Sequence, residues 1–174
     1  MKLLEQIQDL HFPADLPQTL LAVKQTFDAP QVPDVAAAAK AALHEGGLLA
    51  RMKPGATVAI GAGSRGIANL PQIVKATVDA LREAGMHPYV VPAMGSHGGA
   101  TAEGQKTMLA ELGVTEASVG AEIRATMEVK EIGRIADGPP LYQGLDSAAA
   151  DHALLVSRIK PHTDFRSHLE SGPS

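Results

Sequence analysis

Apolar residues recur along this chain in two alternating patterns, short β-branched runs and longer segments with helical spacing. The short runs at residues 57–60, 89–91 and 152–157 predict buried strands. Apolar residues three or four positions apart, followed by a glycine, predict helices at residues 72–84 and 102–112. Because strands and helices alternate with crossovers of this length, we expect an α/β fold with a mostly parallel sheet. Helices on both faces of that sheet would make a Rossmann-like three-layer sandwich.

The segments outside this alternation carry weaker signals. Residues 34–52 are rich in alanine and leucine and predict a helix, with Asp34 as its N-cap and Gly46 and Gly47 as a break. Further elements are expected between the second of the two helices and the last strand. In chain order they are strand at 122–129 and 131–135, a turn at 137–140 and a short helical piece at 146–150.

Prolines and composition suggest a division of the chain. The first part is interrupted by Pro13, Pro17, Pro30 and Pro33. We therefore expect an N-terminal extension at residues 1–33 and an α/β domain at residues 34–174. The residues after Pro161 are polar and include no element that would close the domain, so we expect the polypeptide to continue past Ser174 into a C-terminal domain.

Composition narrows the classes of function. Aromatic residues make up 3% of the 174 residues, the net charge is −4, and no face is obviously basic. A nucleic-acid partner is therefore not expected. The chain has no cysteine, which excludes thiolate chemistry and cysteine-held metals within it. No apolar run suits a signal peptide or a membrane span, so we expect a cytoplasmic protein without a membrane partner.

Three loops follow the predicted parallel strands, and each joins small residues to one long polar side chain. These side chains are Arg65, His97 and His162. Ligands of open parallel sheets bind outside the carboxyl ends of the strands, so we expect all three groups on one edge of the sheet. The remaining histidines carry no functional expectation: His11, His44, His87, His152 and His168.

The first of these loops also matches the dinucleotide fingerprint G-x-G-x-x-G at Gly61, Gly63 and Gly66. This leaves a nicotinamide-dependent oxidoreductase open as an alternative. Two features weigh against it. The next helix starts near residues 69–71 rather than in the loop, and the second strand ends at residues 91–93 without an acidic residue for the ribose. The other interpretation is a glycine-rich turn that lets the backbone approach an anionic ligand.

Three segments together resemble the N-terminal domain of the nickel-dependent lactate racemase family: GAGSRGIANLP, PAMGSHGGATAEG and DHALLVSRIKPHTDF. The similarity runs from about Val58 to the end of the chain. The resemblance implies an isomerase that acts on a small 2-hydroxy acid. It implies His97 and His162 as catalytic acid/bases. Arg65 matches the family's arginine and is suited to bind the substrate carboxylate.

The same resemblance implies a cofactor in the full-length protein, the nickel-pincer nucleotide, which takes a hydride from the substrate carbon and returns it. The residues expected to bind it are Gly63, Ser64, Arg65 and Gly66. The family's lysine tether and nickel-binding histidine would lie beyond Ser174. We therefore expect no metal ligand within this chain, no cofactor bound to it alone, and no activity from it in isolation.

The chain also departs from the family pattern. Ala62 stands where the family has aspartate, and Ser64 stands where it has threonine. The loss of the aspartate favours a further alternative, a relative that binds a ligand without catalysing a reaction.

Overall fold

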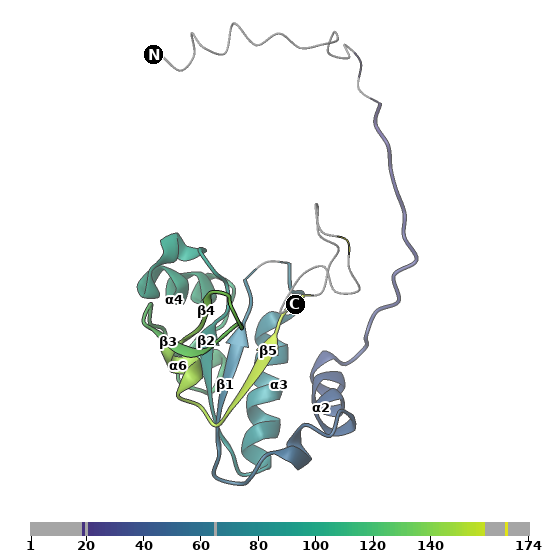
Figure 1. The fold of residues 1–174 in the computed structure, drawn as a ribbon. Helices are drawn as coiled ribbons and strands as arrows, with labels where there is room; N and C mark the ends of the chain where they lie inside the picture. The colour runs from purple at the N-terminus through teal and green to yellow at the C-terminus, as the bar shows by residue number, and fades with distance from the viewer. Residues whose placement is uncertain (1–18, 20, 65, 159–165, 167–174) are drawn as a thin grey trace, which may run out of the picture. The chain divides into compact units, whose positions relative to one another are not determined.

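A computed structural model of the chain describes residue 19, residues 21–64, residues 66–158 and residue 166. The chain divides into two units, residues 1–31 and residues 32–174. Within the first unit, the described residues contain no helix or strand. Every helix and strand of the described residues belongs to the second unit (Figure 1).

Three strands of the second unit form a parallel sheet in the order β2-β1-β5 (Figure 1). The strands are β1 (Thr57–Ala62), β2 (His87–Pro92) and β5 (His152–Val156). In the register of the sheet, Ala62 lies opposite both Pro92 and Val156, so the three carboxyl ends meet at one edge. The predicted parallel sheet is therefore confirmed, and β1 is its central strand.

The helices expected from apolar spacing are present with small shifts of their ends. They are α2 (Val35–Glu45), α3 (Leu70–Glu83) and α4 (Ala102–Glu111). Asp34 caps α2 as expected, since its Oδ1 accepts a hydrogen bond of 2.9 Å from the Ala37 N–H. Thr101 caps α4 in the same way through the Gly104 N–H. A short 3₁₀ helix, η1 (Leu49–Arg51), follows α2.

One face of the sheet carries the main hydrophobic core. Val58 and Ile60 of β1 and Val90 of β2 are fully buried there. The helical spacing of α3 turns a stripe of side chains toward these strands. The partners of the strand residues in this core are Leu70, Val74, Val78, Leu81, Leu109, Val114 and Val119. Helices α3 and α4 and the short α5 (Glu116–Val119) therefore all contribute to one side of the sheet.

The opposite face is covered more thinly. Tyr89 and Val91 are buried with Ala59 in a second, smaller cluster against Ala150, beside the short helix α6 (Leu145–Ala148). Leu155 of β5 remains 50% exposed. The expectation that residues 152–157 form a wholly buried strand is therefore wrong, because among them only Val156 is buried. Within the described residues, β5 has a strand neighbour on one side only, which leaves part of its surface open.

The segment between α4 and β5 also differs from the prediction. Strand β3 (Val129–Arg134) overlaps the expected strand at 131–135, but it pairs antiparallel with an unexpected strand, β4 (Pro140–Gly144). At 122–129 the expected strand is reduced to an isolated bridge between Ile123 and Val90. Every residue of β3 is exposed, so no burial pattern marked its extent in the sequence.

A polar contact joins the amino ends of β1 and β5. The Thr57 N–H and hydroxyl donate to Asp151 Oδ2 at 2.8 and 2.7 Å, and the Asp151 N–H donates to Thr57 Oγ1 at 3.0 Å. These hydrogen bonds favour the ionised form of the carboxylate, and the bond from the Thr57 backbone N–H has the largest effect. The pKa of Asp151 therefore lies below its usual value.

This contact predicts a pH-dependent contribution to stability. Because the folded-state pKa of Asp151 is lowered, its contribution is present above the pKa of the unfolded chain, about 3.9. It is lost as the pH falls through the folded-state pKa. We expect Asp151→Asn to lower the Tm at neutral pH, and the difference from wild type to shrink below about pH 4.

Thermal unfolding of both proteins across the acidic range measures this difference. Asp137→Asn is the matched control, since Asp137 is exposed in the β3–β4 turn with a positive φ of 56° that asparagine tolerates. A Tm difference for Asp151→Asn that stayed constant down to strongly acidic pH would contradict the assignment.

Candidate active site

Ser64 and His97 meet at the carboxyl edge of the sheet. Ser64 lies in the loop after β1, and His97 lies in the loop after β2, just before the short 3₁₀ helix η2 (Gly98–Ala100). The Ser64 Oγ lies 2.5 Å from His97 Nδ1, and both residues are half-buried. The structure thus brings together the first two of the three predicted loops.

The hydrogen bond to Ser64 leaves the other ring nitrogen of His97 for chemistry. A serine hydroxyl can donate or accept, so the bond alone permits either neutral tautomer of the ring. When Oγ accepts from the Nδ1 proton, Nε2 carries the free lone pair and is able to accept a proton from a ligand. The same Nδ1–H···Oγ bond persists in the imidazolium, in which Nε2–H becomes a donor. Ser64 therefore suits a histidine that alternates between base and acid at Nε2.

The pair differs from the nucleophile–base arrangement of a serine hydrolase. In the hydrolase triad the serine bonds to Nε2, and a carboxylate holds Nδ1. Here the serine occupies Nδ1, and within the described part of the chain no carboxylate is bonded to His97. The arrangement therefore favours proton transfer to a ligand over activation of Ser64.

Close packing of two glycines fixes the loop that carries His97. Gly98 has a φ of 64°, in the left-handed region. A Cβ at this position would lie 2.5 Å from the carbonyl carbon of Gly104 and 2.6 Å from the Gln105 nitrogen. The loop thus rests directly on the backbone of the first turn of α4, which leaves no space for a side chain. Thr101 adds a hydrogen bond of 3.0 Å to the Gly98 carbonyl.

Gln105 provides a second support for this loop. Its side chain is buried, with 7% of the residue exposed, and its Nε2 donates to the Gly95 carbonyl at 2.8 Å. Gly95 also has a positive φ, 59°. Because a buried amide requires a partner, this bond ties the start of the loop to α4. The position of His97 is therefore set by backbone packing and by the side-chain hydrogen bonds of Thr101 and Gln105.

The glycines of the first loop have structural explanations of their own. A Cβ on Gly61 would lie 2.6 Å from Leu155 Cδ2, and a Cβ on Gly63 would lie 3.0 Å from Ile67 Cδ1. The Gly63 N–H donates to the Val156 carbonyl at 3.0 Å. These two glycines therefore allow close packing around β1. Helix α3 starts only at Leu70, away from the loop, as its sequence predicted.

Sequence reasoning did not single out Arg158, which follows β5 at the same edge. Its Nη1 donates to the Gly66 carbonyl at 3.2 Å, and its side chain is exposed. The guanidinium is therefore placed beside the first loop, where it adds positive charge. Its position just after a parallel strand was the available signal, in a loop where His162 is the more conspicuous polar residue.

The remaining predicted site residues, Arg65 and His162, lie outside the described residues. Within the described part of the chain, no group of three or more histidine, cysteine, aspartate or glutamate side chains is gathered to hold a metal ion.

None of the described helices has the length and apolar character needed to cross a membrane. In comparisons with known proteins, no protein family matches the chain, and no curated protein matches it significantly.

We expect Ser64 Oγ to accept from the His97 Nδ1–H and thereby to hold the neutral imidazole as one tautomer. We expect Ser64→Ala to leave Nδ1 without its partner, so that the neutral ring exchanges between tautomers. The ¹⁵N chemical shifts of the two ring nitrogens, measured by NMR above the pH at which the ring is protonated, should then move toward each other. Ser96→Ala is the control, because Ser96 is exposed and adjacent to His97. Unchanged ring shifts in Ser64→Ala would refute the assignment of a tautomer held by Ser64.

Gln105 provides a separate test of how the loop is held. Gln105→Met keeps most of the side-chain volume but leaves the Gly95 carbonyl without its donor, so we expect the free energy of unfolding to fall by about 1 kcal/mol. Urea denaturation measures this change. Gln72→Met on the exposed side of α3 is the control and should stay within about 0.5 kcal/mol of wild type. An equal effect of the two substitutions would mean that the Gln105 bond does not stabilise the loop.

Proposed function

We propose that this chain is the N-terminal part of an isomerase, a racemase or epimerase resembling lactate racemase, that acts on a small 2-hydroxy acid. The observation that carries the proposal is the hydrogen bond between Ser64 and His97 at the carboxyl edge of a parallel sheet. It supports an acid/base role for His97, because it orients the ring and leaves Nε2 free.

The reaction requires a proton to leave and return to the substrate hydroxyl on either side of the carbinol carbon. In our proposal, His97 Nε2 accepts that proton from one side while its Nδ1–H stays bonded to Ser64. His162 is assigned the same role on the other side, and Arg65 binds the substrate carboxylate through two parallel hydrogen bonds. These two assignments rest on the sequence and on the rule that loops after parallel strands share an edge.

The nickel-pincer nucleotide is proposed as the cofactor of the full-length protein, where it would supply the hydride acceptor that no side chain provides. The first loop fits the anionic part of such a group. Arg158 places a guanidinium beside Gly66, which has a positive φ of 62°. The Gly63 amide is already bonded to Val156, so contacts from this loop would come from Ser64, Arg65 and Gly66.

The proposal also includes the finer architecture and the setting of the protein. We propose that the parallel sheet belongs to a Rossmann-like three-layer sandwich, with the thinly covered face around Leu155 closed by further structure. In this proposal the N-terminal extension comprises residues 1–33 and the α/β domain comprises residues 34–174. A C-terminal domain would complete the site, in a cytoplasmic enzyme that binds neither nucleic acid nor membrane.

Two alternative functions, a nicotinamide oxidoreductase and a non-catalytic ligand-binding relative, can be separated from our proposal by experiment. A nicotinamide oxidoreductase would use the loop glycines to approach a pyrophosphate, whereas Gly61 and Gly63 pack against Leu155 and Ile67. Fluorescence titration with NADH separates the two, because our proposal expects no saturable binding. A non-catalytic ligand-binding relative is favoured by Ala62 in place of the family's aspartate, and it would show no turnover of any hydroxy acid.

The assigned role of His97 predicts a large loss of activity. In the full-length protein carrying its cofactor, we expect His97→Asn to reduce racemisation or epimerisation of the preferred hydroxy acid by about 100-fold or more. Chiral chromatography of the product measures the rate. His87→Asn is the control, since His87 is exposed at the start of β2, on the opposite edge of the sheet. Undiminished turnover by a folded His97→Asn protein would overturn the proposal.

A further inference from the structure

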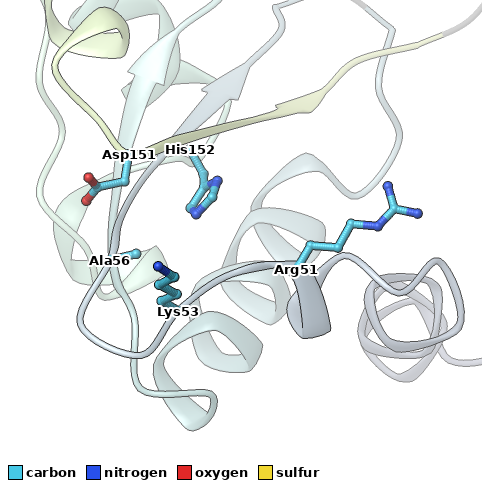
Figure 2. A pocket seen from close by; sticks show the side chains of 5 residues that line it. All are labelled: Arg51, Lys53, Ala56, Asp151 and His152. Carbon is cyan, nitrogen blue, oxygen red and sulfur yellow. The ribbon is translucent and has the colours of Figure 1, made fainter.

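A second feature lies at the opposite edge of the sheet, where β1 and β5 begin. A hollow of about 420 Å³ is lined there by Arg51, Lys53, Ala56, Asp151 and His152 (Figure 2). Its volume falls in the range usual for small-molecule sites, about 300–1,000 Å³. The Ser64–His97 pair belongs to the carboxyl edge of the same sheet, so this hollow is a separate place on the molecule.

The chain segment that carries Arg51 and Lys53 is held in a defined position. Leu49 and Met52 pack against the main core, so the residues on either side of Met52 are left exposed. The segment then turns at Gly55, whose N–H donates to the Gly85 carbonyl at 2.7 Å. The two cationic side chains therefore project from an anchored backbone, which lowers the cost of ordering them around a ligand.

The hollow gathers positive charge without a bound carboxylate to balance it. In the described part of the chain, neither Arg51 nor Lys53 forms an ion pair or a side-chain hydrogen bond. Figure 2 shows the Lys53 ammonium directed toward the imidazole of His152, whereas Arg51 lies on the other side of the hollow with its guanidinium turned away from both. Since the chain as a whole has a net charge of −4, this local excess of cations is not a general property of its surface.

The one acidic group of the lining is already bound elsewhere. The Oδ2 atom of Asp151 accepts both hydrogen bonds from Thr57, and the carboxylate points away from the His152 ring (Figure 2). Asp151 therefore fastens the strands together, and the groups left to meet a ligand are the guanidinium, the ammonium and the imidazole.

We propose that this hollow binds the phosphate group of a small phosphate monoester. Such a group carries close to two negative charges at neutral pH and three terminal oxygens. Lys53 supplies a compact charge to one oxygen beside His152, and the exposed Arg51 side chain turns its guanidinium toward the other two when the ligand binds. The His152 ring, half-buried at the start of β5, adds a further nitrogen at the wall. This inference does not depend on the proposed isomerase activity.

The test uses the full chain with inorganic phosphate and glycerol 3-phosphate as probes, followed by NMR and titration calorimetry. We expect saturable binding, with amide shifts that include Ala56 and His152 but not His97. The double variant Arg51→Gln/Lys53→Gln should weaken binding by about tenfold or more. The control Lys130→Gln/Arg134→Gln removes the same charge from exposed β3 and should change binding by less than about twofold.

Three results would overturn the inference. The first is an absence of saturable binding by either probe. The second is equal weakening in the two double variants, which would show that only overall charge matters. The third is equally tight binding of malonate, a dianion without phosphate geometry, which would remove the assignment to phosphate esters. Because the shift map of the wild-type chain locates the site by itself, the test stands even where a variant is less stable.

Discussion

The parallel pairing of β1 with both of its neighbours is the constraint on which the rest of the structure depends. The backbone hydrogen bonds of this central strand set the register in which Ala62 meets Pro92 on one side and Val156 on the other. Every loop that leaves these strands in the forward direction must therefore start from one edge, whatever its own sequence. The short approach of Ser64 to His97 follows from this register together with the packing of the second loop.

Sequence patterns predicted those parts of the fold whose positions are fixed by burial. The runs at 57–60 and 89–91 became the buried strands β1 and β2, and the spacing in 72–84 became the buried stripe of α3. The hydrophobic pattern did not predict segments in which no side chains alternate between buried and exposed positions. All of β3 is exposed, so its pairing with β4 left no periodic trace, and α5 is too short for its spacing to stand out.

The sequence likewise predicted some features of the candidate site and not others. The edge on which His97 lies could be predicted, because topology alone decides it. Its hydrogen bond to Ser64 could not be predicted. That bond depends on the close packing of Gly98 against the backbone in the first turn of α4, and no sequence pattern indicates such a contact. Arg158 was overlooked beside a more conspicuous histidine. The cationic hollow was not predicted because it lies at the amino ends of the strands, whereas the rule for open parallel sheets places ligands at the carboxyl ends.

The two proposed sites, one at each edge of the sheet, differ in how their side chains are held. At the carboxyl edge, His97 is held by a neutral partner that occupies one ring nitrogen and leaves the other accessible. Such a group is oriented before the ligand arrives, so its side chain loses little further conformational entropy when the ligand binds. At the amino edge, the anchored backbone on either side of Met52 fixes only where the cationic side chains begin, and their charges are left unpaired. A proton-transfer group needs a fixed direction, whereas a group that binds an anion needs unneutralised charge.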